Sequence, residues 1–404
     1  MPWLLRSIVD FFNRLAGWYL HRKYGATARQ LGRQPHREGV SFPPQGDVRR
    51  SFVIIEIDGL AYDYLRTALK QGHMPYLSRL AMSRKLRIAP WRCGLPSTTP
   101  ASQAGIMYGN NWDIPGFRWY DKEAQSSILC KLPGSVRAIQ HRISAGRTGL
   151  LRGGSSYTNM FDGDARLALF TLSALGRDRL FENVRGLGFL ILFALNPGRI
   201  GKVIFLSLWT WILYVVKRLS ALIRPSTPHF TFLGPLLEIF NNIIFREITT
   251  FSVMVDIYRG MPAIYAAYTG YDEIAHHFGA DSREAFRALR GIDQQIRQID
   301  RIRRLYELPG YDLYILSDHG MTPSVPFRRA FGQSLEQWIA DYTGRKVDEP
   351  AVEGEDEGLS EARVYYLLEE IRGLEQRPHR RVTGRILQAT RQELERRLVA
   401  RAQE

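Results

Sequence analysis

Cysteine is scarce in this chain, since only Cys93 and Cys130 occur among its 404 residues. Two thiols cannot build a framework of disulfides, so the fold depends on an apolar core and the redox compartment stays open. The sequence also lacks internal repeats and low-complexity tracts. With 45% hydrophobic and 24% charged residues, the chain as a whole is not disordered. Its length predicts one large domain with additions, or two domains.

The first 25 residues do not have the pattern of a cleavable signal peptide. No basic leader precedes an apolar run, and Asp10 and Arg14 interrupt the apolar residues. The apolar residues instead recur at helical spacing, which predicts an amphipathic helix over residues 1–25. Such a helix either lies in a membrane interface or packs on the protein's own core, and the sequence leaves both open. Residues 26–50 are polar, contain Pro and Gly, and are predicted to be a linker.

Positive charge is in excess and unevenly placed. The net charge is +15, and residues 136–224 alone hold eleven Arg and two Lys against four acidic residues, a net charge of +9. A basic region of this kind suits nucleic acid, anionic lipid or an anionic substrate. No DNA- or RNA-binding signature accompanies it, and its neighbours are long apolar runs. We therefore expect a membrane surface as the partner, and no nucleic-acid duplex.

Two apolar runs, residues 188–195 and 203–216, lie in this basic region and are separated by "NPGRIGK". The second run has fourteen residues without a charge, whereas a helix that spans a bilayer needs about 20. We therefore predict an interfacial or re-entrant hairpin rather than two full spans, with a hairpin buried in the core as the alternative. Together with their surroundings these runs form a basic and apolar insertion at about residues 165–255.

Three short apolar runs alternate with helical patterns, at residues 51–57, 262–268 and 311–317. Runs of this length without a polar face are typical of strands buried on both sides. Strands separated by helices predict an α/β fold with a mostly parallel central sheet flanked by helices. We assign this fold to residues 51–345, followed by an acidic loop and a charged helical tail over residues 346–404.

Polar residues follow each of these strands. Asp58 comes after the first strand, Asp272 and His276 after the second, and Asp318 and His319 after the third. In an open α/β sheet ligands bind at the carboxyl ends of the strands, so these side chains are expected to converge. Carboxylates gathered in this way need positive charge between them. Mixed Asp and His donors suit zinc, manganese or iron, and two adjacent ions suit phosphoryl chemistry.

A pair of threonines, Thr98 and Thr99, precedes a helical pattern in "PSTTPASQAGIMYG". Thr99 is the predicted N-cap and Pro100 the first helical residue. Backbone N–H groups at a helix start attract phosphate, and a metal ion nearby favours the alkoxide form of a threonine hydroxyl. This stretch therefore contains a candidate nucleophile.

Four motifs, "IDGL", "PSTTPASQAGIMYG", "YDEIAHHFG" and "SDHGM", occur in this order. With them the chain resembles the alkaline phosphatase superfamily, and within it the type I phosphodiesterases and nucleotide pyrophosphatases. The resemblance implies an alkaline phosphatase-like fold and two divalent metal ions, either zinc or manganese. It implies that one ion is bound by Asp58, Asp318 and His319, and the other by Asp272 and His276.

The resemblance also implies a threonine nucleophile that contacts the metal ions and forms a covalent phospho-enzyme. The family pattern P-x-x-T selects Thr99 and the pattern T-x-P selects Thr98; we favour Thr99 because of its place at the helix start. Relatives carry an Asn nearby that contacts the phosphate, but residues 101–103 are here Ala, Ser and Gln. Asn110 and Asn111 are the candidates for that contact. Trp112 is a candidate for a leaving-group pocket, with packing as the alternative.

One ligand of the family pattern has no clear counterpart. A third histidine normally completes the second metal site beyond the DHG motif, and the only histidine after His319 is His379, in an unrelated context. Either the chain is shorter than a full family member, or His277 or water substitutes, or the second metal site is weak.

These observations predict a phosphoric ester hydrolase. It is expected to be a metal-dependent enzyme at a membrane surface that cleaves phosphodiester or pyrophosphate bonds in a small phosphate ester or a lipid head group. A phosphomonoesterase and a lipid head-group phosphotransferase are the alternatives within the superfamily. The alternative of another class is a non-catalytic, membrane-bound scaffold with an incomplete metal site.

Overall fold

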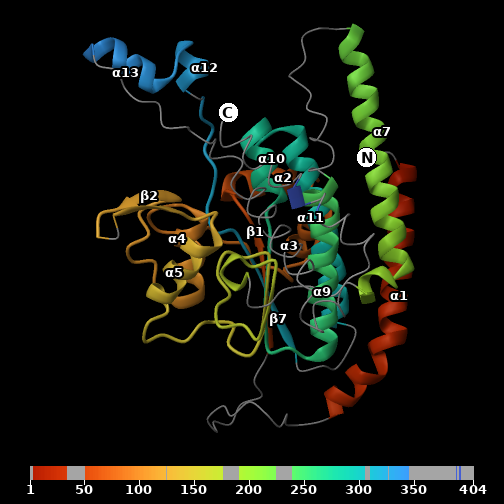
Figure 1. Cartoon of the computed structure of the whole chain (residues 1–404). Helices are drawn as coiled ribbons and strands as arrows, with labels where there is room; N and C mark the ends of the chain where they lie inside the picture. Colours follow the sequence, from red (N-terminus) through yellow and green to blue (C-terminus); the bar gives the residue numbers. More distant parts are fainter. Residues whose placement is uncertain are drawn as a thin grey trace.

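A five-stranded sheet forms the centre of the computed structural model, with the strands in the order β5-β4-β6-β1-β7 (Figure 1). Every pairing in this sheet is parallel. The predicted α/β class with a mostly parallel central sheet is therefore confirmed. The strands are β1 (Ser51–Ile57), β4 (Ser155–Tyr157), β5 (Leu167–Leu169), β6 (Ala263–Tyr268) and β7 (Tyr311–Leu316). The structure describes residues 3–33, 51–123, 125–175, 191–223, 239–304, 310–325 and 327–344, with 388, 391 and 392.

The register of β1 between β6 and β7 sets the position of the site. Ile57 pairs with Tyr268, and Glu56 pairs with Leu316. The residues that directly follow these three strands therefore meet at one edge of the sheet, which we call the carboxyl edge. β1 reads "SFVIIEI", and all its residues except Phe52 are buried, as expected for a central strand of a parallel sheet.

Helices cover both faces of the sheet. In Figure 1, α4 (Thr99–Tyr108) and α5 (Pro133–Ile143) lie on one side, and α9 (Arg246–Arg259) and α11 (Arg283–Arg304) lie on the other. α11 buries apolar residues at helical spacing and exposes arginines on its opposite face. The smaller elements are α2 (Tyr62–Lys70), α3 (Pro75–Met82), the antiparallel hairpin of β2 (Arg118–Asp121) and β3 (Ser126–Leu129), the 3-10 helix η1 (Leu172–Ala174), the π-helical turn η2 (Phe240–Phe245), α10 (Gly270–Phe278), α12 (Phe327–Phe331) and α13 (Leu335–Thr343).

The N-terminal helix α1 (Trp3–Arg33) packs on the protein's own core. It buries Leu5, Val9, Ala16 and Leu20, whereas Phe11 and Trp18 on its outer side are 60% and 55% exposed. The packed helix is one of the two arrangements left open by the sequence. α1 also continues to Arg33, so the prediction of a linker from residue 26 is wrong for residues 26–33. Residues 26–33, "ATARQLGR", contain enough good helix formers to extend the helix. Residues 34–50 lie outside the described part of the chain.

α7 (Pro197–Ile223) is one unbroken helix beside α1. The helix begins at Pro197, six residues before the apolar run 203–216. Proline is favoured in the first turn of a helix, which explains this start. Gly198 and Gly201 let the two helices approach closely, since a Cβ at either position would overlap α1. α7 is therefore longer than the apolar run of fourteen residues seen in the sequence. Pro197–Val216 forms a 20-residue segment of mean hydropathy 1.5 that is long and apolar enough to cross a membrane.

The boundaries of the predicted insertion also change. β5 joins the central sheet and α9 covers it, so both ends of residues 165–255 belong to the α/β core. β5 is only three residues long, and a run this short carries no readable alternation. The predicted acidic loop and helical tail, residues 346–404, lie outside the described residues except for 388, 391 and 392.

Candidate metal centre

Three of the predicted ligands form one cluster at the carboxyl edge. Asp58 follows β1 directly, and Asp318 and His319 follow β7 after one intervening residue. One donor atom from each of the three lies within 4.8 Å of the others. His319 Nε2 is 3.4 Å from Asp58 Oδ1 and 3.6 Å from Asp318 Oδ2. The parallel register of β1 and β7 thus brings together residues that are 260 positions apart in the chain.

The carboxylates of this cluster are buried, and three of their four oxygens have no hydrogen-bond donor among the described residues. Both oxygens of Asp58 and the Oδ2 atom of Asp318 are inaccessible to solvent and accept no hydrogen bond within the described residues. Burial, followed by the charges of Asp318 and Asp272, raises the pKa of Asp58 well above its ordinary range. An unpaired buried carboxylate is costly unless a cation compensates it. Two carboxylates and an imidazole are donors that suit a divalent ion such as zinc or manganese, so the residues present fit the predicted metal.

Asp272 lies beside this cluster, on the helix that follows β6. A Cβ atom at Gly59 would overlap Asp272 Oδ1, so glycine at this position lets the aspartate approach the turn after Asp58. Gly59 also has φ +71, which favours glycine. Asp272 Oδ1 is buried without a hydrogen bond among the described residues, and Asp272 Oδ2 lies 3.4 Å from His276 Nε2, one turn further along α10. Asp272 thus lies against the turn that follows Asp58, and His276 lies against Asp272.

Thr99 contacts the cluster, and Thr98 does not. Thr99 Oγ1 is 3.2 Å from His319 Nε2, whereas Thr98 Oγ1 is buried and has no hydrogen-bond partner in the part of the chain that the structure describes. The N-cap of α4 is Thr98, in extended conformation, and Thr99 is the first helical residue. The prediction of Thr99 as N-cap and Pro100 as first helical residue is therefore wrong by one position, because proline is tolerated throughout the first helical turn.

A buried hydrogen-bond network ties α4 to β1 below the cluster, and no sequence pattern predicts which residues pair in it. Gln103 Nε2 donates to Glu56 Oε1 at 2.7 Å, and Gln103 Oε1 accepts from the Met160 backbone N–H at 2.8 Å. Tyr265 Oη, on β6, also donates to the Glu56 carboxylate. Burial and the charge of Asp318 raise the pKa of Glu56 well above its ordinary value. The one sequence signal was a charged residue, Glu56, inside an otherwise apolar strand.

A second set of contacts holds the turns after β1 and β7 together. The Leu60 N–H donates to Ser317 Oγ at 2.8 Å, and Ser317 Oγ donates to the His319 carbonyl at 2.6 Å. The Gly59 N–H lies 3.3 Å from Asp318 Oδ1. His319 Nδ1 lies 3.1 Å from the Gly320 carbonyl oxygen, which can only accept a hydrogen bond, so this contact places a proton on Nδ1 and turns Nε2 towards Thr99 and the carboxylates.

The predicted phosphate-contacting residues are not brought to the cluster. Asn110 and Asn111 lie beyond the far end of α4, a ten-residue helix about 15 Å long that has Thr99 at its start. Asn110 donates to the Ile143 carbonyl and accepts from the Trp112 N–H, so it holds the local turn. Trp112 is 82% exposed. The side chain of His277 and the whole of His379 lie outside the described residues, so the third ligand of the second site stays a prediction.

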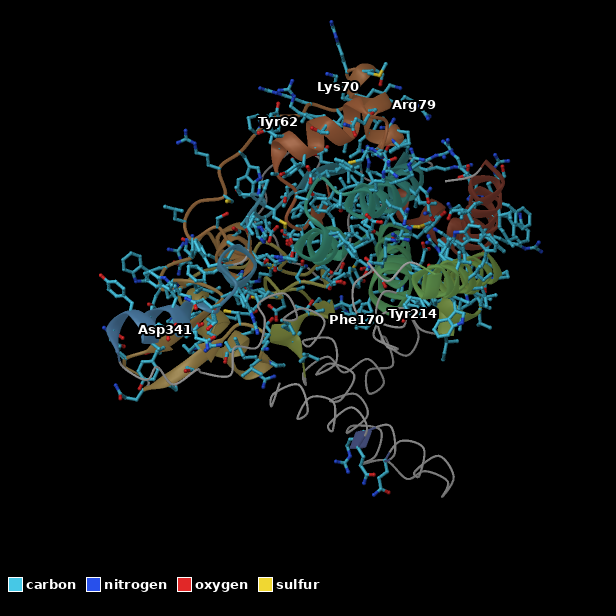
Figure 2. The ribbon with its side chains drawn as sticks, turned by 90° about the horizontal axis from the view of Figure 1, so that it is seen from above. Tyr62, Lys70, Arg79, Phe170, Tyr214 and Asp341 are labelled. Carbon is cyan, nitrogen blue, oxygen red and sulfur yellow. The ribbon has the colours of Figure 1, made fainter. Side chains whose placement is uncertain are left out.

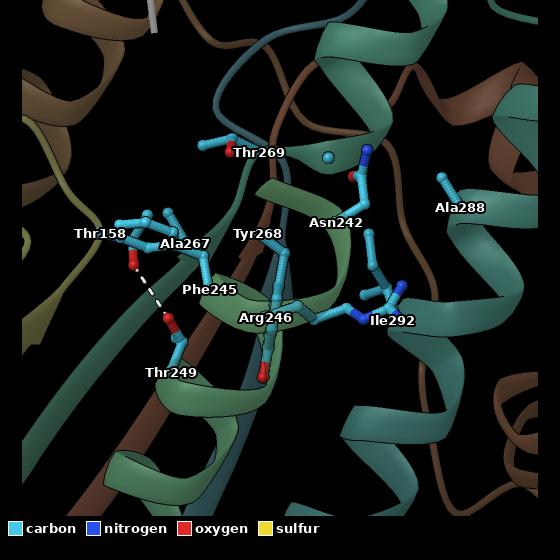
Figure 3. Close-up of a pocket in the computed structure, with 11 residues that line it drawn as sticks. Thr158, Asn242, Phe245, Arg246, Thr249, Ala267, Tyr268, Thr269, Ala288 and Ile292 are labelled. Carbon is cyan, nitrogen blue, oxygen red and sulfur yellow. Dashed lines mark hydrogen bonds between the residues drawn. The ribbon is translucent and has the colours of Figure 1, made fainter. Parts of the chain in front are cut away.

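A pocket lies on the other side of the start of α10 and contains none of the predicted site residues (Figure 3). Its polar lining comes from Asn242, Arg246 and Thr269, together with a hydrogen-bonded pair, Thr158 and Thr249, whose hydroxyls are 3.0 Å apart. Asn242 also packs against Gly270, two residues before Asp272, since a Cβ at Gly270 would overlap its Oδ1 atom. The pocket therefore borders the helix that carries the second pair of predicted ligands.

Residues 246–398 match the family model of type I phosphodiesterases and nucleotide pyrophosphatases. The match contains Asp272, His276, Asp318 and His319, and it confirms the resemblance stated from the motifs. A solved structure, phosphonoacetate hydrolase from Sinorhizobium meliloti 1021 in complex with phosphonoformate, is 15% identical with a TM-score of 0.41. The alignment covers 74% of this chain and 63% of that one. No curated protein matches the sequence significantly.

Proposed function

We propose that this chain, which resembles type I phosphodiesterases and nucleotide pyrophosphatases, is a metal-dependent hydrolase of phosphodiester or pyrophosphate bonds with Thr99 as its nucleophile. One observation carries the proposal. The Thr99 hydroxyl lies at the start of a helix and 3.2 Å from His319 Nε2, beside two buried carboxylates, Asp58 and Asp318, of whose four oxygens three have no hydrogen-bond donor among the described residues. A buried cluster of this kind is uncommon without a bound cation, and it also favours an enzyme over a non-catalytic scaffold.

In this proposal Asp58, Asp318 and His319 hold one divalent ion, and Asp272 and His276 hold a second. The bound ions would supply positive charge that favours the threonine alkoxide and offsets the charge of the transferred phosphoryl group. Gly59 supports both sites, because it lets Asp272 lie beside the Asp58 turn.

The protein's own groups then orient the reacting atoms. The first N–H groups of α4 have no partner within the helix and lie at its positive dipole end, which suits an anionic phosphoryl group next to Thr99. Gln103 and Glu56 fix α4 to β1, so the hydroxyl of Thr99 keeps its distance from the carboxylate of Asp58. Thr99 Oγ would lose its proton and form a bond to phosphorus while the ester or anhydride oxygen leaves and takes up a proton from solvent. Water then hydrolyses the resulting phosphodiester of Thr99, which restores the threonine hydroxyl.

The proposal is tested with the purified full-length chain, supplied with zinc or manganese, and a soluble chromogenic phosphodiester. We expect Thr99→Ala to lower turnover by more than about 10³-fold, the scale for loss of a nucleophile, and Thr98→Ala to lower it by less than about tenfold. Metal analysis should find two ions per chain, and chelation should abolish turnover. If Thr98→Ala is the inactive variant, the nucleophile is wrongly assigned. A metal-free protein that hydrolyses neither diesters nor monoesters would overturn the enzyme proposal in favour of a scaffold.

We further propose that the enzyme works at a membrane surface. The support is the candidate span Pro197–Val216, together with the basic composition of residues 136–224. Its substrate would be a phosphate ester, either a small soluble one or a lipid head group. Turnover of a soluble diester and of a phospholipid in vesicles, measured on one preparation, separates these two substrate classes.

A further inference from the structure

The outer part of α7 is apolar on every side and exposed. Between Trp211 and Val216 all residues but Tyr214 are exposed, and Ile212 reaches 52%. Ile204 and Leu208, on the preceding turns, are 54% and 58% exposed. A helix that is apolar all round is typical of a protein interior or of a membrane. Within the described residues no protein interior covers this part of α7.

The inner part of α7 is anchored inside the protein by charge. Arg199 and Lys202 are both buried and pair with Glu247 of α9, with Lys202 Nζ at 2.5 Å from Glu247 Oε1. Lys202 also donates to Asn13 of α1 at 2.9 Å. Because these cations are satisfied within the protein, only the stretch from residue 203 onward is available to lipid. Residues 203–216 are about 21 Å long, whereas the hydrocarbon core of a bilayer is about 30 Å thick.

α7 and the metal cluster face the same way. Figure 1 shows α7 rising past α10, the helix that begins at the carboxyl edge of the sheet. Figure 2 views the molecule from above, so it looks onto this edge, with Tyr214 of α7 and Asp341 of α13 on opposite sides of it. A surface that received the outer part of α7 would therefore lie over the metal cluster.

The loop before the nucleophile brings an exposed aromatic side chain to this edge, and the same loop carries exposed basic side chains. Residues 83–98 contain four exposed cations, Arg84, Lys85, Arg87 and Arg92, and no acidic residue. Trp91 is held at the edge because its Nε1 donates to the Ser317 carbonyl at 3.0 Å, two residues before His319, yet its ring is 51% exposed. Exposed aromatic and cationic side chains side by side are typical of a protein surface that enters the head-group region.

α12 and α13 add further exposed aromatic side chains on the side of the carboxyl edge opposite α7 (Figure 1). Phe331, Trp338 and Tyr342 are 65%, 44% and 81% exposed. Trp338 stacks on Tyr342, with ring centroids 5.6 Å apart, so the aromatic surface is preformed. Exposed apolar side chains thus occur on three separate elements around one edge, which indicates a shared partner surface.

We propose that the carboxyl edge docks onto an anionic lipid bilayer, with residues 203–216 of α7 entering the acyl region and the metal cluster facing the head groups. The positive loop of residues 83–98 favours anionic lipid over a neutral membrane. Combined with the proposed phosphodiesterase activity, this orientation makes lipid head groups the substrate class, because they reach Thr99 without leaving the bilayer. The docking itself does not depend on that activity.

The experiment compares binding of the full-length chain to vesicles of phosphatidylcholine alone and of phosphatidylcholine with phosphatidylserine, by co-sedimentation. Ile212→Glu tests the helix, and Leu150→Glu is its control. Leu150 is 41% exposed, and its N–H bonds Met107 at the far end of α4 from Thr99, away from the carboxyl edge. Arg92→Glu tests the loop, and Arg152→Glu, which precedes β4 at the opposite edge, is its control. Circular dichroism checks that all four variants fold.

We expect tighter binding to the anionic vesicles, a loss of about hundredfold for Ile212→Glu and of about tenfold for Arg92→Glu, and no change in either control. Ile212→Glu should hydrolyse a soluble diester at the wild-type rate. Absent vesicle binding, or equal loss in Ile212→Glu and Leu150→Glu, overturns the docking. If Ile212→Glu weakens vesicle binding and Arg92→Glu does not, the proposed orientation of the carboxyl edge towards the bilayer is overturned. If binding behaves as expected but no ester is hydrolysed, the docking stands and the proposed function fails.

Discussion

Removing the charge of Glu247 should weaken the packing of α7 on the rest of the protein and so lower the unfolding free energy. Glu247 is fully buried between the cations of Arg199 and Lys202, and its Oε1 atom also accepts from Gln295 Nε2 at 2.6 Å. Glu247→Gln keeps the shape of the side chain but leaves two buried cations without a counter-ion. Breaking a buried ion pair from one side costs about 3–5 kcal/mol of unfolding free energy.

The pKa of Glu247 corresponds to a similar loss of unfolding free energy. Burial alone would raise this pKa, but the charges of Lys202 and Arg199 outweigh it and lower the pKa from 4.5 to about 2. A depression of this size corresponds to about 3 kcal/mol of stability at neutral pH. Because the pKa is lower in the folded state, this stability is fully present above pH 4.5 and is lost as the pH falls towards 2.

Chemical denaturation at pH 7 measures the effect, with Asp113→Asn as the matched control. Asp113 pairs with Arg142 at 2.7 Å, but both side chains are exposed, so its loss should cost less than about 1 kcal/mol. We expect Glu247→Gln to lower the unfolding free energy by about 3 kcal/mol or more, with the difference from wild type shrinking as the pH falls from 5. Equal losses in Glu247→Gln and Asp113→Asn, or a difference that does not change with pH, would refute the reasoning.

Two further substitutions test how the metal centre is held. Gly59→Ala should lower turnover about hundredfold, because the added Cβ displaces Asp272. The control is Gly72→Ala, at φ +72 with nothing within 4 Å of its Cβ, which should cost only about 1 kcal/mol of stability and leave turnover unchanged. Equal turnover in the two variants would contradict the role of Gly59. Gln103→Leu should lower turnover about tenfold and the unfolding free energy by about 1–3 kcal/mol, because it leaves Glu56 Oε1 without a donor. A loss of stability with turnover intact would show that Gln103 does not position Thr99.

The sequence predicted that Asp58, Asp318 and His319 would lie together because they occur at strand ends. Asp58 and the Asp318–His319 pair follow apolar runs that are unmistakable as buried strands, and parallel strands bring such positions to one edge. The start of α4 was misplaced by one residue because proline is compatible with several positions of the first turn.

Other features depend on contacts between distant residues, and no local pattern reveals them. Gln103 and Glu56 are 47 positions apart, and only the packing of α4 on β1 makes them partners. The length of α7 was underestimated because Arg199 and Lys202 interrupt its apolar pattern. Both cations pair with Glu247 from another helix. Asn110 was a candidate for the phosphate contact because residues 101–103 lack the Asn of the family pattern, but it lies beyond the end of α4 opposite Thr99.

The covalent state of Thr99 during turnover tests the central claim most directly. The full-length, metal-loaded chain is mixed with a phosphodiester, quenched in acid within the first turnovers, digested and examined by mass spectrometry. The account predicts a phosphorylated or phosphoester-modified peptide with the modification on Thr99, and none in Thr99→Ala. Turnover with an unmodified Thr99, or with the modification on Thr98, would contradict it.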